Sequence, residues 1–160
     1  MSNVVLRAAN NEDIEAIALV WYEAWGDGHT GNVPAELHAY RKLEHFRERV
    51  PQRITNTTVA LIEGRIVGFV TVHNDEVEQI FVLQQARGTG AATKLLAHAE
   101  YQIAQKYPIA WLAVVEGNDR AQTFYKREGW QDKGPIQYEA ETADGPLTIP
   151  THRYEKPLAR

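Results

Sequence analysis

The sequence predicts an α+β fold with a mixed but mostly antiparallel central sheet of about seven strands. Three observations support this prediction. Residues 57–82 form one long β-branched stretch interrupted twice by turn-forming dipeptides, which is typical of consecutive antiparallel strands. Residues 76–115 then contain a strand, a glycine-rich turn, an amphipathic helix and a second strand, the order expected of a parallel pair. That second strand, 109–115, is entirely apolar, which indicates burial on both faces.

The N-terminal third is predicted to contain one strand and two helices. Residues 4–8 (VVLRA) are expected to form the first strand. An asparagine pair can cap the helix that follows, and apolar residues at helical spacing extend it to about Trp25. Residues 26–34 (GDGHTGNVP) are rich in turn formers and predict a loop. Pro34 suits the first turn of a second helix, which runs to about Val50.

The rest of the chain is predicted to supply six strands and two helices. Three antiparallel strands, joined by two tight turns, are expected at 57–62, 65–73 and 76–82. The helix after the glycine-rich turn carries apolar residues on one face, namely Ala92, Leu95, Leu96, Ala99 and Ile103. Strand 109–115 follows, and Asn118 caps a helix to about Arg127. Two final strands form a hairpin, in which Pro150 predicts a bulge or an edge position for the last strand.

Length and composition limit the classes of function. The 160 residues indicate one domain spanning 1–160. A net charge of −4 argues against a long nucleic-acid partner. Cysteine is absent, which excludes disulfides, thiolate metal sites and cysteine nucleophiles, and the histidine spacing predicts no metal site. The N-terminus is polar and no apolar run approaches the ~18 residues of a membrane span, so we expect a cytoplasmic protein without membrane partners.

The glycine-rich turn predicts an anion-binding site. A helix N-terminus has unpaired N–H groups and a partial positive charge. Gly88 and Gly90 let the backbone come close to a ligand at this point. Arg87 and Lys94 add positive charge, and no acidic residue occurs in this segment before Glu100. A phosphate or pyrophosphate is therefore the expected ligand.

Three phosphate-binding motifs compete for this turn. The Walker loop requires Lys and Ser or Thr after its last glycine, whereas two alanines follow here. The dinucleotide fingerprint G-x-G-x-x-G would have Thr93 at its third glycine, and antiparallel strands precede the turn where that fold would begin. The third motif, Q-x-x-G-x-G/A, fits at Gln85, Gly88 and Gly90.

A second signature lies downstream of the turn. Residues 118–130 (NDRAQTFYKREGW) match the pattern N-x-x-A-x-x-F-Y-x-x-x-G-F, with Trp130 at the last aromatic position. The two motifs, with a strand between them, resemble the GNAT superfamily of acyl-CoA N-acyltransferases, and the element order over 4–156 resembles its whole fold. This resemblance implies helices on both faces of the sheet and a splayed parallel strand pair that forms the acyl-CoA cleft.

The resemblance implies that acetyl-CoA is the co-substrate and lies between the splayed strands. Such strands leave backbone polar groups that need partners, and the pantetheine amides are suitable ones. The N–H of Val82 is the candidate that stabilises the oxyanion of the tetrahedral intermediate. The residues expected to bind the cofactor are Phe81, Val82, Leu83, Arg87, Gly88, Thr89, Gly90, Ala91, Asn118 and Tyr125.

The implied reaction is direct attack of a primary amine on the thioester in a ternary complex. A base must first remove a proton from the amine. Glu78 is the expected base, because it shares strand parity with Ile80 and Val82. Glu76, on the same face, and His73 are the alternatives.

Tyr125 resembles the general-acid tyrosine of the family, which protonates the leaving thiolate.

Each of these candidate residues also has a purely structural explanation. Tyr125 can simply pack in the core with its hydroxyl satisfied, and Asn118 can serve only as a helix cap. Glu78, Arg87 and Lys94 can be ordinary solvated charges.

The acceptor pocket is expected at Trp25, His29, Thr30 and Tyr40, because the segment after the first helix usually builds it in this fold. Glutamates nearby can attract a cationic amine. A polyamine, an amino acid, an aminoglycoside and a protein N-terminus all stay open as acceptors. The alternative function is a non-catalytic module that senses acyl-CoA, and the expected assembly is a monomer or homodimer.

Overall fold

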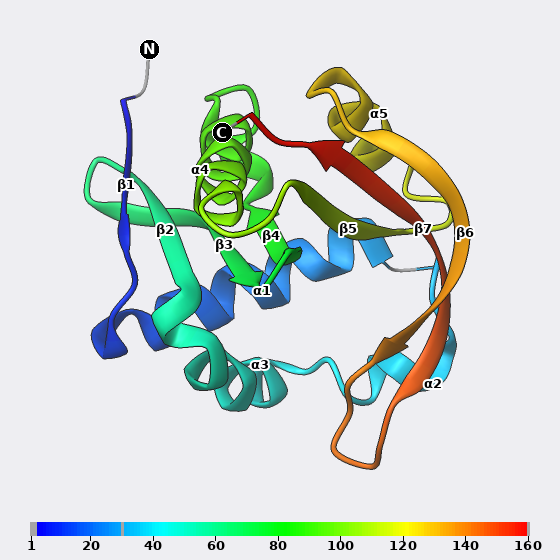
Figure 1. The fold of residues 1–160 in the computed structure, drawn as a ribbon. Helices are drawn as coiled ribbons and strands as arrows, with labels where there is room; N and C mark the ends of the chain where they lie inside the picture. The colour runs from blue at the N-terminus through cyan, green and yellow to red at the C-terminus, as the bar shows by residue number, and fades with distance from the viewer. Residues whose placement is uncertain (1–2, 30, 160) are drawn as a thin grey trace.

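The computed structural model describes residues 3–29 and 31–159. Seven strands form one mixed sheet in the order β1-β2-β3-β4-β5-β7-β6 (Figure 1). All neighbouring strands are antiparallel except β4 and β5, which are parallel. The predicted α+β class with its single parallel pair is therefore confirmed.

The elements follow one another along the chain in nearly the predicted order. The strands are Val4–Ala8 (β1), Thr57–Ile62 (β2), Arg65–His73 (β3), Glu76–Val82 (β4), Ile109–Val115 (β5), Gln131–Ala140 (β6) and Leu147–Pro157 (β7). The α-helices are Ile14–His29 (α1), Ala35–His38 (α2), Leu43–Arg49 (α3), Ala91–Ala104 (α4) and Asp119–Arg127 (α5). Short 3-10 helices occur at Asn11–Asp13 (η1), Val50–Asn56 (η2) and Gln84–Ala86 (η3). Strands β1 to β5 have the predicted bounds.

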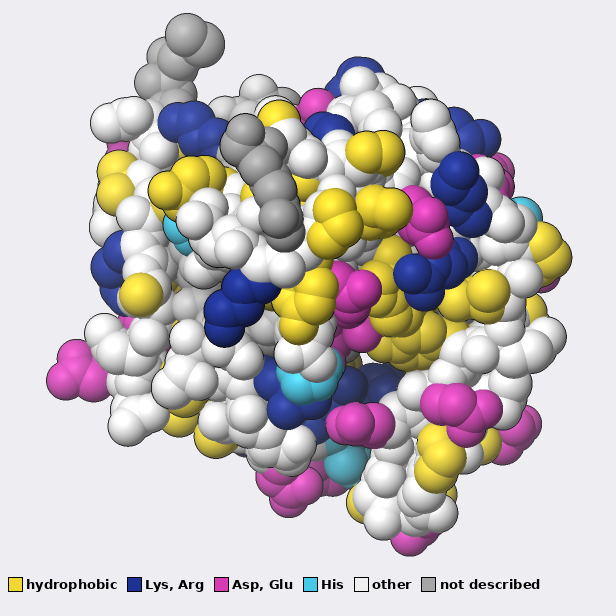
Figure 2. Space-filling view, in the orientation of Figure 1, with side chains coloured by type: hydrophobic (Ala, Val, Ile, Leu, Met, Phe, Trp, Pro, Cys, Tyr) yellow, Lys and Arg dark blue, Asp and Glu magenta, His cyan; other side chains and the backbone are white. Residues whose placement is uncertain are grey.

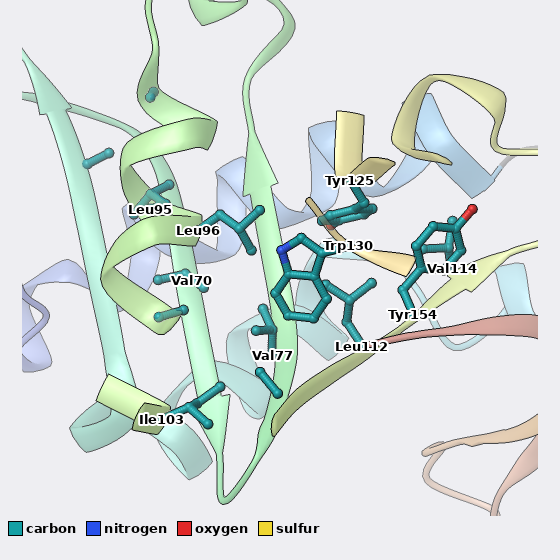
Figure 3. Packing of buried hydrophobic residues seen from close by; sticks show 14 of the residues in the cluster. Val70, Val77, Leu95, Leu96, Ile103, Leu112, Val114, Tyr125, Trp130 and Tyr154 are labelled. Carbon is teal, nitrogen blue, oxygen red and sulfur yellow. The ribbon is translucent and has the colours of Figure 1, made fainter. Parts of the chain in front are cut away.

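The two faces of the sheet are covered by different helices, as expected. Helix α4 packs on one face, and Figure 3 shows this core with Val70, Val77, Leu95, Leu96 and Ile103. Helices α1 and α3 pack on the opposite face. There the ring of Trp21 lies 4.8 Å from that of Phe46 and 5.7 Å from that of Phe69. The sheet therefore separates two hydrophobic cores.

Helix α1 is longer than predicted. It continues to His29 through residues 26–28, for which the sequence predicted a loop. Glycine in a helix costs up to about 1 kcal/mol relative to alanine. Two contacts accompany this last turn: within the helix, the rings of Trp25 and His29 stack 4.8 Å apart, and across the fold, Asp27 forms an ion pair with Arg87.

The single helix predicted over 34–50 is wrong. The chain forms α2 and α3 with a break between them and then continues as the 3-10 helix η2. Arg41 lies in the break and is only 7% exposed. Its guanidinium donates hydrogen bonds to the carbonyl oxygens of Tyr40 (3.0 Å) and Glu141 (2.8 Å). The break therefore lets a buried arginine reach the β6–β7 turn, which the helical spacing does not reveal.

Strand β4 contains a β-bulge at Glu78. In its pairing with β3, Thr71 opposes Gln79 but Val72 opposes Val77, so Glu78 is the extra residue. The bulge inverts the alternation of side chains. Glu78 therefore lies on the face of the sheet opposite Ile80. The prediction that Glu78 shares a face with Ile80 and Val82 is wrong.

The last strand also differs from expectation. Strand β7 lies between β5 and β6 and is not an edge strand. Pro150 pairs with Gln137 of β6, one residue beyond the last β5 pair, which joins Val115 and Thr151. The register shift lies instead in β6, between Asp132 and Pro135. The prediction that Pro150 marks a bulge or an edge strand is thus wrong. Strand β5 ends at Val115, opposite Thr151, so the missing N–H of Pro150 interrupts no pairing between β5 and β7.

Candidate functional site

The parallel strands β4 and β5 diverge soon after they meet. In the part of the chain that the structure describes, they pair only at Glu76 and Trp111, supported by a hydrogen bond from the Trp111 N–H to the Asp75 carbonyl (3.0 Å). Beyond this point a cleft of about 920 Å³ opens between them. The glycine-rich turn, the start of α4 and the helix α5 complete its walls.

The backbone of β4 presents a hydrogen-bond donor to this cleft. The N–H of Leu83 donates to the carbonyl of Val67 on β3, at 2.8 Å. Consecutive N–H groups along a strand point to opposite sides. The N–H of Val82 therefore points away from β3, toward the gap between β4 and β5. Val82 lines the cleft, whereas Leu83 does not.

The glycine-rich turn has the conformation that an anion site requires. Gly88 (φ 81°) and Gly90 (φ 87°) are left-handed, and a β-carbon on either would meet no atom within 4 Å. Glycine is therefore needed for the backbone angle rather than for space. The hydroxyl of Thr89 donates to the Ala86 carbonyl (2.6 Å), which closes the turn, and Thr89 itself does not line the cleft. The turn leads directly into Ala91, the first residue of α4.

An acidic residue that is remote in sequence lies beside this turn. Asp27, at the end of α1, forms an ion pair with Arg87 at 3.5 Å, and both side chains are about one-third exposed. Asp27 and Asp119 also line the cleft. The lack of acidic residues in the local sequence before Glu100 therefore does not leave the turn free of negative charge. A bound phosphate would compete with Asp27 for Arg87.

Tyr125 lies on α5 between the cleft and the α4 core. Its ring lies 5.2 Å from that of Phe124 and 6.3 Å from that of Trp130, and Figure 3 shows it beside Trp130. Burial raises the pKa of the Tyr125 hydroxyl above its ordinary value, so this phenol stays protonated at physiological pH. Asn118 caps α5 by accepting a hydrogen bond from the Ala121 N–H (3.3 Å), and it also lines the cleft. Helix capping and ligand contact are thus compatible for Asn118.

A second cavity of about 150 Å³ adjoins the cleft and is walled by α1, α2, α3, β4 and the β6–β7 hairpin. Trp25 and His29, two of the residues that the sequence analysis expected in the acceptor pocket, line it. The Nδ1–H of His29 donates to the Trp25 carbonyl (2.9 Å), and burial lowers the pKa of His29 to about 4. His29 is therefore neutral at physiological pH, with Nε2 as a hydrogen-bond acceptor. It lines both the cleft and the cavity.

Tyr40, which the sequence analysis also expected in the acceptor pocket, has a different position. Tyr40 does not line this cavity, and its hydroxyl instead donates to Asp144 at 2.7 Å, which ties the α2–α3 connection to the β6–β7 turn. Thr30 lies outside the described residues.

Two glutamates of β4 lie where the cleft and the cavity meet. Glu78 lines both and forms an ion pair with Arg53, whose Nε lies 3.2 Å from its Oε1. Glu76 lines only the cavity and accepts a hydrogen bond from the Tyr138 hydroxyl (2.8 Å). Burial, with a smaller effect from the negative charge of Glu78, raises the pKa of Glu76 to about 7.

Sequence reasoning missed the cationic side of the cavity. Arg41 and Arg49 line it, and Arg53 holds Glu78. The only available signal was that Arg49 and Arg53 flank Val50, an apolar position of the predicted helix, at helical spacing. This pattern is also typical of exposed basic residues, so it did not identify them. Tyr138 was missed as well, because no local pattern indicates its hydrogen bond to Glu76, which is 62 residues away.

Glu76→Gln is expected to stabilise the protein at alkaline pH. The carboxyl has a pKa of 4.5 when free and about 7 in the fold, so the folded state binds its proton more tightly. The free energy of unfolding of the wild type therefore falls as pH rises from about 4.5 to about 7, by at most about 3 kcal/mol. Glutamine cannot ionise and still accepts the Tyr138 hydrogen bond. Urea unfolding of both proteins should show no difference at pH 4.5 and a more stable variant at pH 8.

The exposed Glu23→Gln on α1 is the matched control for this measurement and should track the wild type at both pH values. A constant difference between Glu76→Gln and wild type across this range would contradict the raised pKa.

Comparisons with known proteins agree with this geometry. A family model described as an acetyltransferase (GNAT) domain matches residues 11–148. An uncharacterised N-acetyltransferase from Archaeoglobus fulgidus is 29% identical over 136 residues, which cover 75% of this chain and 88% of that protein. A GCN5-related N-acetyltransferase structure from Rhodopseudomonas palustris has a TM-score of 0.77 at 19% identity, with 99% and 98% of the two chains covered. The PaiA N-acetyltransferase from Thermoplasma acidophilum, solved in complex with coenzyme A, has a TM-score of 0.75 at 17% identity, with 97% and 99% covered.

Residues 3–29 and 31–159 contain neither a membrane-spanning helix nor a metal-binding cluster. No helix there is long and apolar enough to cross a membrane. No group of three or more His, Asp or Glu side chains is placed to hold a metal ion.

Proposed function

The chain belongs to the GNAT family of N-acetyltransferases, and from that premise we propose that it transfers an acetyl group from acetyl-CoA to a primary amine in a ternary complex. One observation carries this proposal. The diverging strands β4 and β5 open a cleft that has the glycine-rich turn at one end and the N–H of Val82 along its wall. This arrangement provides an anion site and a backbone donor within one continuous cavity.

The cofactor is expected to lie along this cleft. The pyrophosphate would be held by the backbone N–H groups of Gly88 and Gly90 and by the charge of Arg87. Thr89 braces the turn, and its hydroxyl oxygen accepts the Ala91 N–H (3.3 Å), which a phosphate oxygen would replace. The pantetheine amides would pair with the open edge of β4 near Phe81 and Val82. Coenzyme A in the Thermoplasma neighbour supports this ligand class.

Glu78 is proposed as the general base. It is the glutamate that lines both the cleft and the acceptor cavity, so an amine between the two would lie beside it. Its ion pair with Arg53 holds the carboxylate in place. The N–H of Val82 would stabilise the oxyanion that forms when the amine attacks the thioester carbonyl.

Glu76 is the alternative base, and the pH profile separates the two glutamates. A base with a pKa of about 7 would make kcat/KM rise through pH 7 and level off above it. If Glu76→Gln removes that inflection, Glu76 is the base. If Glu78→Gln abolishes turnover while Glu76→Gln retains it, Glu78 is the base.

Tyr125 is proposed as the general acid. The thioester cleavage releases a thiolate, which needs a proton, and Tyr125 lines the cleft with a hydroxyl that burial keeps protonated.

The second candidate function is an acyl-CoA sensor of the same fold. It would use the same cleft but would turn over no amine.

Thermal unfolding with acetyl-CoA, CoA, NAD and ATP, each added alone, tests the cofactor. A ligand at 100 times its Kd stabilises by about 2.7 kcal/mol, which raises the Tm of a domain of this size by about 5–10 °C. We expect this shift with acetyl-CoA and CoA only. Arg87→Gln should reduce the shift, and the exposed Arg65→Gln on β3 should not. A shift with NAD or ATP alone would overturn the proposal, and binding of CoA without turnover of any amine would support the sensor.

A further inference from the structure

The acceptor cavity contains one arginine that makes no hydrogen bond or ion pair among the described residues, although the charges of Glu141 and Glu78 act on it from a greater distance. Arg49 is the last residue of α3, and its guanidinium carbon lies 4.6 Å from the centre of the Trp21 ring. Across the described residues, its guanidinium has no hydrogen bond and no ion pair with a carboxylate. A guanidinium has five N–H donors, so a half-buried one that lacks partners is suited to an incoming anion.

The three other arginines of this segment are already occupied. Arg41 donates to two backbone carbonyls, Arg47 forms an ion pair with Glu15 at 2.7 Å, and Arg53 holds Glu78. Arg49 is therefore the basic group of the cavity wall that is left available for a ligand. Burial lowers its pKa from the ordinary value, but a guanidinium stays charged at physiological pH.

Glu78 and Arg49 lie at different distances from the cleft, so the cavity has a carboxylate at the end near the cleft and a guanidinium at the end away from it. Glu78 lines the cleft, the cavity and a small adjoining pocket. Arg49 lines the cavity and the small pocket but not the cleft. A bound molecule would therefore meet the carboxylate near the thioester and the guanidinium farther away. Figure 2, drawn in the orientation of Figure 1, shows a hollow in the surface with hydrophobic, basic and acidic side chains around it.

We infer that the acceptor is an amino acid, whose carboxylate binds Arg49 while its amine lies beside Glu78. This inference rests on the proposed acetyl transfer and names its substrate class. Apolar side chains of Trp25, Leu37 and Ile149 also line the cavity and suit an apolar substrate side chain. A polyamine is the competing class, because Glu139 and Glu141 also line the cavity and could receive its second cation.

Matched pairs of acceptors test the inference. Each pair consists of an apolar amino acid and the amine that lacks its carboxylate: leucine with 3-methylbutylamine, and phenylalanine with 2-phenylethylamine. Spermidine is added as a polyamine. Release of CoA from acetyl-CoA is measured for the wild type, Arg49→Met and Arg49→Lys. Arg47→Met, an exposed arginine two positions earlier on α3, is the matched control.

The wild type is expected to favour each amino acid over its paired amine. Arg49→Met should raise KM for the amino acids by about 10- to 100-fold, the loss expected for a hydrogen-bonded charge pair, and leave KM for the amines unchanged. Arg49→Lys should recover part of the loss, and Arg47→Met should behave like the wild type. The methionine stem retains contact with Trp21, and CoA-induced thermal shifts verify that each variant is folded.

The outcomes separate the inference from the proposed function. If the paired amines or spermidine are acetylated as well as the amino acids, or if Arg49→Met affects both members of a pair equally, the inference is overturned and acetyl transfer stands. If CoA binds but no amine of the panel is consumed, the inference is overturned, whereas acetyl transfer fails only if aminoglycosides and peptides with a free N-terminus are not acetylated either.

Discussion

Tyr125→Phe is expected to lower kcat by about 100-fold or more, because positioned general acids contribute on the order of 10²–10⁴ to rate. The substitution removes only the hydroxyl, and the ring keeps its packing against Phe124 and Trp130. The KM for acetyl-CoA and the Tm should therefore change little. Steady-state kinetics over a range of pH, with thermal unfolding in parallel, make the measurement.

Tyr101→Phe is the control for Tyr125→Phe, since Tyr101 on α4 is 69% exposed. It should match the wild type in kcat and Tm. If Tyr125→Phe also retained full turnover at every pH, the thiolate would have to take its proton from another donor, and the acid role of Tyr125 would be excluded.

Gly68→Ala should strongly destabilise the protein. A β-carbon at Gly68 of β3 would lie 2.9 Å from the carbonyl oxygen of Phe81, 2.9 Å from Cγ2 of Val82 and 3.2 Å from Cδ1 of Leu95. The carbonyl belongs to the β4 backbone and can move away only if the strand moves. Overpacking of this kind costs about 1–3 kcal/mol, which lowers the Tm by about 5 °C or more.

The same substitution should impair catalysis, because it pushes on the segment of β4 that carries the N–H of Val82. Adding Val82→Ala removes one of the two closest contacts and keeps that N–H, so the double variant should recover part of the lost stability relative to the sum of the single changes. A Tm for Gly68→Ala within 1 °C or so of the wild type would show that β3 and β4 separate here without cost, contrary to their packing.

Local signals in the sequence were sufficient for most of the sheet. The turns between β2, β3 and β4 contain Glu63 (φ 51°), Gly64 (φ 78°) and Asn74 (φ 56°), and their left-handed conformations fix where each strand ends. The glycine-rich turn was also predictable, because Gly88 and Gly90 mark a backbone conformation rather than a contact. Such features depend on neighbouring residues only.

Features that depend on remote residues were not predictable. The last turn of α1 places Asp27 beside Arg87, and the break after α2 places Arg41 against the carbonyl of Glu141, 100 residues later. The bulge at Glu78 was hidden because a strand with one extra residue has no distinctive composition. The cationic side of the cavity was hidden for a similar reason, since a buried and an exposed arginine look alike in a helix.

The bulge in β4 has an evolutionary consequence. Without Glu78, Val77 and Gln79 would be adjacent, and the alternation of core residues would run unbroken through Ile80 and Phe81. The extra residue is therefore equivalent to a one-codon insertion that leaves the hydrophobic pattern on both faces intact. Such an insertion adds a carboxylate and a local bend in a single step. A strand without the bulge could thus gain this acidic group while the buried residues on both faces of the sheet stay unchanged.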